Sequence, residues 1–428
     1  MTTRLHLLKV LIFITACAAT FTTEARTELT SATFDFTATK DRDGVLAVTP
    51  KTAYTDSLGY GWRNGYFTLA VPDGSYRVTV TYGNRRKAGE LTLRAESRRL
   101  FVENAVTAKK EIRTEVFTVN KRTPAYTDEK GRDARVRIKK REEPKLNWDD
   151  YLTFEVGGGS PLLQRLEIAP ADTSVTHVYL CGNSTVVDQD YEPWASWGQM
   201  VTRFFDEDVC VVNCAESGET AQSFISQGRL AQIVSRLKAG DYIFMEFGHN
   251  DQKTDGNIGN GAFYSFQQQL KVFVDYARKV GAHPVFCTPT RRRMFDSEGK
   301  IRDTHLDYPE AMRFMAEREG IPCIDLQEST RVMFEAWGPE TSKHAFVHYS
   351  AGCWPGQDNE LADDTHFNAF GAYQIALLVL QGIVDLDLPL AKHIKAGFPG
   401  IDPENPADWQ QFKYVTSLQT EALKPDGN

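Results

Sequence analysis

Apolar and polar residues alternate in short runs through the first part of the chain, and turn residues separate the runs. Alternation with a period of two indicates strands that bury one face, and many short strands are typical of a β-sandwich. Residues 28–170 are therefore predicted to form an all-β domain, in which the polar segment 121–145 is a loop or an irregular hairpin. The alternating runs lie at 66–71, 76–82, 91–93, 115–119, 152–156 and 162–168.

Beyond residue 170 the pattern changes, because continuous apolar runs alternate with stretches of helical periodicity. Strands that are apolar on both faces need cover on both sides, so this pattern predicts a parallel sheet between two layers of helices. We expect an α/β domain with a five-stranded parallel sheet over 175–390, and a tail over 391–428 that lies on the surface. The predicted strands are 175–182, 209–215, 241–248, 283–288 and 322–326, and the helices lie near 197–205, 223–238, 264–280, 308–319, 327–337 and 367–384.

Charge changes at the same place. The whole chain carries −8, but residues 27–170 hold 25 Lys and Arg against 20 Asp and Glu, a balance of +5. Residues 171–428 hold 21 against 36, a balance of −15. This difference predicts two domains that meet different partners, and no nucleic-acid partner is expected.

The first 25 residues have the composition of a signal peptide. Arg4 and Lys9 precede the apolar run 10–16, which is too short to span a membrane. The four residues that end at Cys17 resemble a bacterial lipobox, so Cys17 is a candidate for lipidation and membrane anchoring. Ordinary cleavage and soluble secretion are the alternative. Either way we expect an exported protein, periplasmic or at the cell surface.

Four short polar motifs mark the second domain. Three of them follow predicted strands, and the fourth precedes the last helix. The carboxyl ends of parallel strands meet at one edge of a sheet, where open α/β sheets bind their ligands. The motifs are therefore expected to form one site. They are Gly-Asn-Ser-Thr at 182–185, Ala-Glu-Ser-Gly-Glu-Thr at 215–220, Phe-Gly-His-Asn-Asp at 247–251 and Asp-Asp-Thr-His at 363–366.

The residue types in these motifs suffice for acyl transfer. Ser184 is the candidate nucleophile, and it needs a base such as His366 to take its proton. Asp363, three residues before His366, is the candidate group that orients the imidazole. The backbone N–H groups of Ser184 and Gly218 and the side chain of Asn250 are candidate donors to the oxyanion. Each motif alone is explained as well by turn or packing chemistry, so the prediction depends on all four together.

Together these motifs resemble those of the SGNH (GDSL-type) hydrolases. Within that superfamily, 182–199, 247–251, 289–293 and 363–371 are similar to the rhamnogalacturonan acetylesterases. The resemblance covers about 175–385 and implies a flavodoxin-like sheet and hydrolysis of acetyl esters on the rhamnogalacturonan backbone of pectin. It implies no metal and no organic cofactor. It also implies the triad Ser184, His366 and Asp363 and an oxyanion hole of Ser184, Gly218 and Asn250.

Three positions depart from common patterns. Asn183 stands where the superfamily has Asp, and Glu219 stands where many relatives have Arg, which puts substrate contacts there in doubt. Glu219 is otherwise explained as a solvated loop residue. Val186 ends the first motif where the strained elbow of an α/β-hydrolase would have Gly, which argues against that fold.

Substrate contacts are predicted from arginine and tryptophan. Arg291 and Arg292 follow the fourth strand, and arginine binds the carboxylates of galacturonate well. Trp194 is predicted to stack on a sugar. Ion pairing of the arginines within the domain is the alternative.

The sandwich resembles galactose-binding-like modules. We expect it to help hold the anionic glycan through the basic clusters 85–87 and 98–99. A sandwich that only stabilises its neighbour is the alternative.

The rival functions are deacetylation of another polysaccharide, such as xylan, and glycan binding without catalysis. The expected partner is an acetylated pectic polysaccharide or oligosaccharide.

Overall fold

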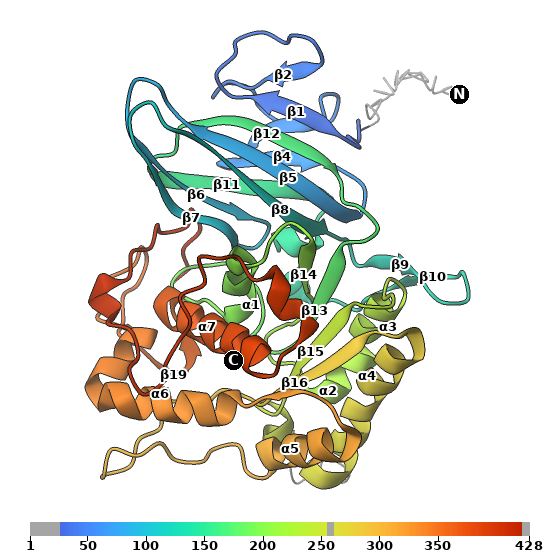
Figure 1. Ribbon diagram of the computed structural model, residues 1–428, viewed down its shortest axis with the longest axis vertical. Coiled ribbons are helices and arrows are strands. Elements are labelled where there is room, and N and C mark those ends of the chain that lie inside the picture. The colour runs from blue at the N-terminus through green and yellow to red at the C-terminus, as the bar shows by residue number, and fades with distance from the viewer. Residues whose placement is uncertain (1–25, 255–260, 422–428) are drawn as a thin grey trace, which may run out of the picture.

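The computed structural model describes residues 26–254 and 261–421. The predicted signal peptide and Cys17 lie outside the described residues. Two regions follow one another along the chain, an all-β region above and an α/β region below in Figure 1. Among the described residues, no helix combines the length and apolar character that a membrane span requires.

The all-β region consists of two five-stranded sheets that face one another (Figure 1). Alternate side chains of the facing strands, such as Phe67, Val80, Phe117 and Leu166, are buried between them, as the period of two predicts. One sheet has the order β2 (Val45–Ala47), β1 (Ala32–Asp35), β12 (Leu163–Pro170), β5 (Gly74–Gly83), β8 (Ile112–Lys121). The other has the order β3 (Tyr60–Arg63), β4 (Tyr66–Ala70), β11 (Tyr151–Ser160), β6 (Gly89–Ala95), β7 (Arg99–Thr107).

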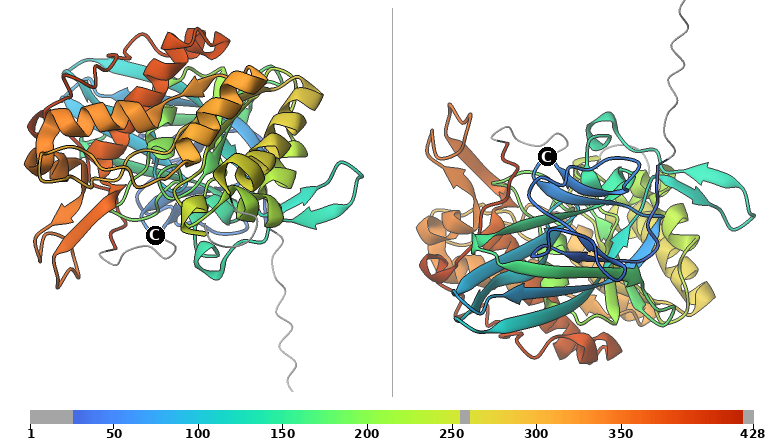
Figure 2. Two further views of the ribbon diagram at one scale, coloured as in Figure 1. Left: turned by 90° about the horizontal axis from the view of Figure 1, so that it is seen from below. Right: turned by 90° about the horizontal axis from the view of Figure 1, so that it is seen from above.

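The polar segment between β8 and β11 is partly ordered into short elements. It contains the hairpin β9 (Ala125–Thr127) and β10 (Asp133–Arg135), which projects from the side of the molecule in both views of Figure 2. Two 3₁₀ turns follow, η1 (Lys140–Glu142) and η2 (Leu146–Trp148).

The α/β region is built on one five-stranded sheet in which every neighbouring pair is parallel. Side chains alternate between its two faces, so Val178 and Leu180 enter one core while Tyr179 and Cys181 enter the other. This arrangement confirms the predicted α/β fold with a five-stranded parallel sheet. The order is β14 (Val209–Asn213), β13 (Thr176–Gly182), β15 (Tyr242–Glu246), β16 (His283–Cys287), β17 (Cys323–Ile324).

Helices cover both faces of this sheet. One face packs against α1 (Trp197–Met200), α6 (Leu326–Thr341) and α7 (Ala369–Asp385). The other packs against α2 (Ala221–Ser226), α3 (Arg229–Val234), α4 (Gln267–Val280) and α5 (Tyr308–Glu319). Where one helix was expected over 223–238, the chain forms α2 and α3, because Gly228 adopts a φ of 83° between them. The remaining turns are η3 (Val201–Phe204), η4 (Asp251–Thr254), the π-turn η5 (Ala262–Phe266), η6 (Ser342–Ala345), η7 (Pro389–His393) and η8 (Trp409–Gln411).

A short antiparallel pair, which the sequence pattern did not reveal, lies between α6 and α7. It consists of β18 (Phe346–Tyr349) and β19 (Leu361–Phe367). The pairing shifts register, because Val347 pairs with Asp363 while its neighbour Phe346 pairs with Phe367. Residues 364–366 therefore bulge out of the ladder.

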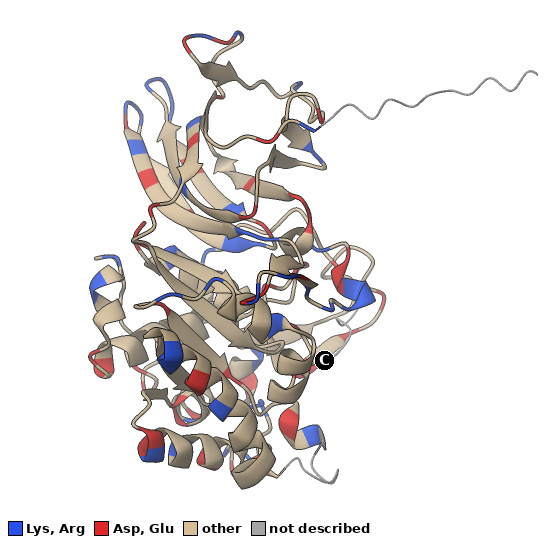
Figure 3. Ribbon diagram, turned by 90° about the vertical axis from the view of Figure 1, so that its right-hand side faces the viewer, with Lys and Arg blue, Asp and Glu red and all other residues tan. Residues whose placement is uncertain are grey.

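The two regions are packed together without a break. Leu100 of β7 belongs to the same buried cluster as α7, and its carbonyl accepts a hydrogen bond from Thr202 Oγ1 at 2.5 Å. The tail then runs back to the sandwich, where the Lys413 carbonyl accepts from Asn104 Nδ2 at 2.6 Å. Lys and Arg are intermixed with Asp and Glu over both regions (Figure 3).

Candidate active site

Ser184 lies in the turn that leaves the carboxyl end of β13, the second strand of the parallel sheet. A Cβ on Gly182 would meet Val186 Cγ2 at 2.6 Å and the Glu246 carbonyl oxygen at 2.8 Å, so the turn requires glycine there. Asn183 is fully buried and holds the turn, since its Oδ1 accepts from the Thr185 backbone N at 3.2 Å and from Thr185 Oγ1 at 3.0 Å. The turn thus leaves the Ser184 side chain at the sheet edge.

Ser184, His366 and Asp363 form a continuous chain of hydrogen bonds. Ser184 Oγ lies 2.9 Å from His366 Nε2, and His366 Nδ1 lies 2.9 Å from Asp363 Oδ2. Burial acts to raise the pKa of the Asp363 carboxyl. The hydrogen bond and charge of His366, with the backbone N–H groups of Thr365 and His366, outweigh burial and hold that pKa well below its usual range. An ionised Asp363 accepts the Nδ1 proton, which leaves Nε2 free to accept from the serine hydroxyl.

The bulge in β19 brings Asp363 and His366 together. Residues three apart in sequence commonly meet across one turn of a helix, but Asp363 and His366 lie in a strand and meet across the bulge instead. Between its two paired ends the chain loops out over three residues, so the side chains at 363 and 366 meet across the loop. Asp364 points elsewhere, with its Oδ1 2.6 Å from Arg293 Nη1 and 2.8 Å from His348 Nε2. The structure therefore brings Asp363, and not Asp364, to His366.

The candidate oxyanion donors lie in the first three motifs. Gly218 has a φ of 76°, which a residue with a side chain rarely adopts. Asn250 Nδ2 donates to the Glu219 carbonyl at 3.1 Å, and Asn250 Oδ1 accepts from Lys253 Nζ at 2.9 Å, so the amide orientation is fixed. Within 26–254 and 261–421, the backbone N–H groups of Ser184 and Gly218 donate to no acceptor. Both are therefore available to an oxygen in the site.

Lysine and arginine side chains of the segment 139–145 of the sandwich contact the residues around Gly218. The sequence pattern did not predict these contacts. The Ser217 carbonyl accepts from Lys139 Nζ at 3.0 Å and from Arg141 Nη2 at 2.5 Å. Lys139 Nζ also pairs with the Glu219 carboxylate. Glu219 has no exposed surface, so it is not a solvated loop residue.

Glu216, on the other side of Gly218, is held in the same way. Its Oε2 lies 2.9 Å from Lys145 Nζ and its Oε1 lies 3.3 Å from Arg141 Nε, while 1% of the residue is exposed. Burial acts to raise the pKa of Glu216, but the nearby cations, Lys145 first, lower it overall. The segment itself is anchored by Glu142, whose two carboxylate oxygens accept from Arg229 Nη2 at 2.7 and 2.6 Å.

Glu246 is a second group that the sequence analysis missed, because it reads as the polar end of an apolar strand. It is fully buried behind the Ser184 turn and accepts from Thr185 Oγ1 at 2.8 Å and from Trp197 Nε1 at 2.5 Å. Burial raises the pKa of Glu246 to about 7, although these hydrogen bonds oppose the shift. Glu246 thus connects the base of the serine turn to α1.

A buried pair of imidazoles supports the third motif. His249 Nδ1 lies 2.9 Å from His305 Nε2. Burial holds the pKa of both histidines well below the usual value, and nearby positive charges act in the same direction. Both are therefore neutral, and they contribute position rather than charge.

The predicted substrate residues have different surroundings. Arg291 pairs with Asp303 at 3.1 Å, as the alternative of pairing within the domain expected. Arg292 donates to the backbone carbonyls of His249 at 3.0 Å and Thr304 at 2.9 Å, without an ion pair to a described carboxylate. Trp194 is 1% exposed and has no face for a sugar, so the prediction that it stacks on substrate is corrected.

One group of side chains could hold a metal ion. Asp206, Asp208 and His393 lie close together. The Asp206 carboxylate already pairs with His393 at 3.1 Å, and the Asp208 carboxylate pairs with Arg77 at 2.8 Å. Asp206 and Asp208 precede β14, at the opposite end of the strands from Ser184. The cluster therefore plays no part in the site described above.

Comparison with known proteins gives a consistent result. Residues 174–373 match the model of the GDSL-like Lipase/Acylhydrolase family. The chain is 43% identical over 219 residues to the rhamnogalacturonan acetylesterase RhgT of Bacillus subtilis (strain 168), covering 51% of this chain and 93% of the relative. It is 33% identical over 220 residues to the probable rhamnogalacturonan acetylesterase YesY of the same organism, covering 51% and 97%.

Among solved structures, protein YXIM of Bacillus subtilis aligns with a TM-score of 0.47 at 23% identity. That alignment covers 84% of this chain and 99% of the other.

Proposed function

Because this chain belongs to the GDSL-like lipase and acylhydrolase family and is a carboxylic ester hydrolase, we propose that it removes acetyl groups from the rhamnogalacturonan backbone of pectin. The observation that carries this proposal is the hydrogen-bonded chain Ser184–His366–Asp363 beside the Gly218 turn. The 43% identity to a rhamnogalacturonan acetylesterase supports the choice of substrate.

In the proposed mechanism, Ser184 Oγ attacks the acetyl carbonyl carbon while His366 Nε2 takes the hydroxyl proton. The carbonyl oxygen becomes an oxyanion that accepts from the N–H groups of Ser184 and Gly218 and from Asn250 Nδ2. The intermediate collapses, and the sugar oxygen leaves with the proton from His366. Water then attacks the acetyl-serine with His366 as base, which releases acetate and restores Ser184.

The cationic segment of the sandwich has a positioning role in this proposal. Glu216 and Glu219 are buried carboxylates on either side of Gly218, and a buried charge without a partner is strongly unfavourable. Lys139, Arg141 and Lys145 neutralise them, and Lys139 and Arg141 also donate to the Ser217 carbonyl, so these cations keep the Gly218 N–H aimed at the site.

The substrate's galacturonate carboxylates are proposed to meet Arg292, the arginine of the 291–293 run whose hydrogen bonds go to carbonyls.

The sandwich is proposed to be a galactose-binding-like module. We also propose that residues 1–25 direct export of the protein, either with a lipid on Cys17 or without one. Mass spectrometry of the mature N-terminus distinguishes the two, since only lipidation leaves an acylated cysteine as the first residue.

Acetate release from acetylated rhamnogalacturonan, acetylated homogalacturonan and acetylated xylan tests the substrate. We expect the highest kcat/KM on rhamnogalacturonan and a large loss on xylan, whose backbone carries no carboxylate for Arg292. Equal rates on xylan would overturn the assignment to pectin. No release from any ester would instead support a protein that only binds glycans.

A further inference from the structure

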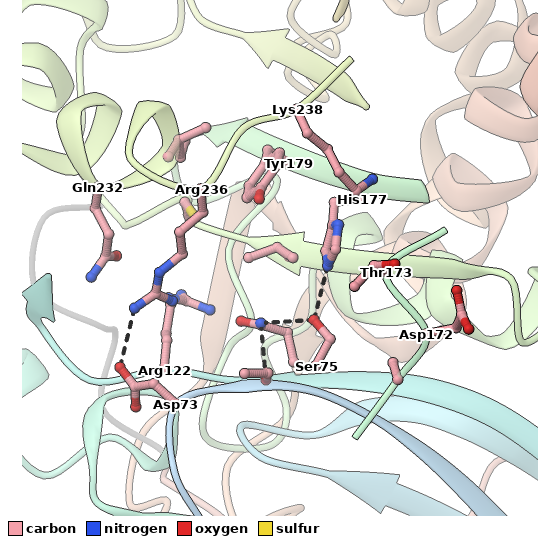
Figure 4. A pocket seen from close by; sticks show the side chains of 16 residues that line it. Asp73, Ser75, Arg122, Asp172, Thr173, His177, Tyr179, Gln232, Arg236 and Lys238 are labelled. Atoms are coloured by element: carbon pink, nitrogen blue, oxygen red, sulfur yellow. Dashed lines mark hydrogen bonds and ion pairs between the residues drawn. The ribbon is translucent and has the colours of Figure 1, made fainter. Parts of the chain in front are cut away.

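A cavity of about 390 Å³ lies between the sandwich and the α/β region, on the side of the sheet away from Ser184. It opens beside His177, at the start of β13, whereas Ser184 follows the other end of the same strand. The volume is in the range of small-molecule sites and would hold one sugar residue. Both regions contribute lining residues, which Figure 4 shows.

Arg122, the residue after β8, is the unusual member of this lining. It is 2% exposed, and its Nη2 donates to the Asn213 carbonyl at 2.5 Å. Its Nε and Nη1 are buried without an acceptor among the described residues. Burial lowers the pKa of this guanidinium, and the charges of Arg99 and Arg236 act in the same direction. The guanidinium lies over the Trp148 ring, 4.6 Å from its centre, and the Asp188 carboxylate opposes the shift, but neither contact supplies an acceptor to Nε or Nη1. Buried donors without acceptors are unfavourable, and an anion would supply the missing acceptors.

A second guanidinium stands at the same end of the cavity. Arg236 Nη2 lies 3.2 Å from Asp73 Oδ2. The Asp73 carboxylate also pairs with Lys121 and accepts from the backbone N–H of Thr123. Asp73 therefore serves two cations, Arg236 and Lys121, and does not balance both charges. Figure 4 shows Arg122 and Arg236 next to each other above Asp73. Planar guanidinium groups bind carboxylates well, often with two parallel hydrogen bonds.

The rest of the lining offers neutral polar groups. Ser75 Oγ lies 2.9 Å from His177 Nε2 and accepts from Asn120 Nδ2 at 3.2 Å, which leaves Asn120 Oδ1 buried and without a donor. Val212 and Ile233 add apolar surface. A hydroxyl group would satisfy Asn120, and ring carbons would cover the apolar part.

We propose that this cavity binds one residue of a sugar acid, with the carboxylate on Arg122 and Arg236 and a hydroxyl on Asn120. An inorganic anion would satisfy the arginines but would leave Asn120 and the apolar lining unused. The proposal does not depend on the reaction at Ser184, because no residue of the proposed triad or oxyanion hole lines this cavity.

Isothermal titration of the full chain with galacturonate, galactose and inorganic phosphate tests the proposal. Galactose is the matched ligand, since it differs only in carrying a hydroxymethyl group in place of the carboxylate. We expect saturable binding of galacturonate, at least about tenfold weaker binding of galactose, and a weaker affinity for phosphate. Arg122→Gln and Arg236→Gln should each weaken galacturonate binding by about tenfold or more.

Arg77→Gln serves as the control, because it removes an arginine of the sandwich that does not line this cavity. It should leave galacturonate binding unchanged. If Arg122→Gln fails to fold, Arg236 decides, because its side chain is 30% exposed and its loss leaves no buried group unpaired. Absence of binding, equal binding of galactose, tighter binding of phosphate, or unchanged galacturonate binding in Arg236→Gln would each overturn the proposal.

Discussion

The two regions of the molecule differ in net charge, and several of the opposite charges pair where the regions meet. The positive sandwich places Arg98 and Arg99 against Glu192 at 2.5 Å and Asp188 at 3.0 Å of the negative α/β region. Arg98 and Arg99 are 2% and 0% exposed, so the expectation that they hold a glycan is wrong. The lesson is that opposite net charges in consecutive regions can reflect pairing between them rather than attraction of a substrate.

The same comparison holds at the candidate site. The α/β region contributes every side chain of the proposed chemistry, yet its Gly218 turn carries two buried carboxylates that it does not neutralise by itself. The sandwich contributes Lys139, Arg141 and Lys145 to that turn. The two regions therefore form one unit, and the following experiments separate what each contributes.

Apart from loss of the nucleophile itself, the largest effect is expected from Asp363→Asn within the α/β region. An amide can donate to His366 Nδ1 and stabilise the wrong tautomer, so turnover should fall on the order of 10⁴-fold with little change in stability. Asp364→Asn is the matched control, since Asp364 pairs with Arg293 and His348 and should cost much less. Similar losses in both variants would contradict the role proposed for Asp363.

Asn250→Ala should have the next largest effect. Removing one donor to the oxyanion lowers turnover by roughly 10²–10³-fold. Because this donor acts on the transition state, kcat should fall while KM changes little. A variant with normal kcat and a raised KM would show instead that Asn250 contacts the bound substrate.

Lys145→Met tests the contribution of the sandwich to the site. It leaves the buried Glu216 with fewer cations, and breaking a buried pair costs about 3–5 kcal/mol of unfolding free energy. Chemical denaturation measures that loss. Lys145→Arg should recover stability, and the exposed Lys130→Met should change neither stability nor kcat.

A smaller effect is expected from Glu246→Gln, measured as stability against pH. The pKa of Glu246 rises from 4.5 to about 7 on folding, so the folded state holds this proton more tightly. Its stabilising effect is full below pH 4.5 and is lost as pH rises through 7. Glu246→Gln should therefore reduce the fall in stability between pH 5 and 8 by about 1–3 kcal/mol. An unchanged pH profile would mean that Glu246 is ionised throughout.

Sequence patterns revealed what depends on neighbours along the chain. The alternation of strands and the five parallel strands are local features, so periodicity predicted them, and the four motifs were found from the residue types that they contain. The bulge that joins Asp363 to His366 depends on the partner strand β18, and the burial of Trp194 depends on packing between regions. The pairing of Lys139 with Glu219 joins residues 80 positions apart, which no local pattern encodes.

We propose that Ser184 is the nucleophile of an esterase whose site both regions complete. The decisive experiment measures acetate release from acetylated rhamnogalacturonan by wild type and Ser184→Ala, with thermal unfolding to show that both proteins are folded. We expect Ser184→Ala to unfold at the wild-type temperature and its turnover to fall by about 10⁶-fold, the size seen when a nucleophile of this kind is removed. A folded Ser184→Ala protein that releases acetate at the wild-type rate would show that Ser184 is not the nucleophile.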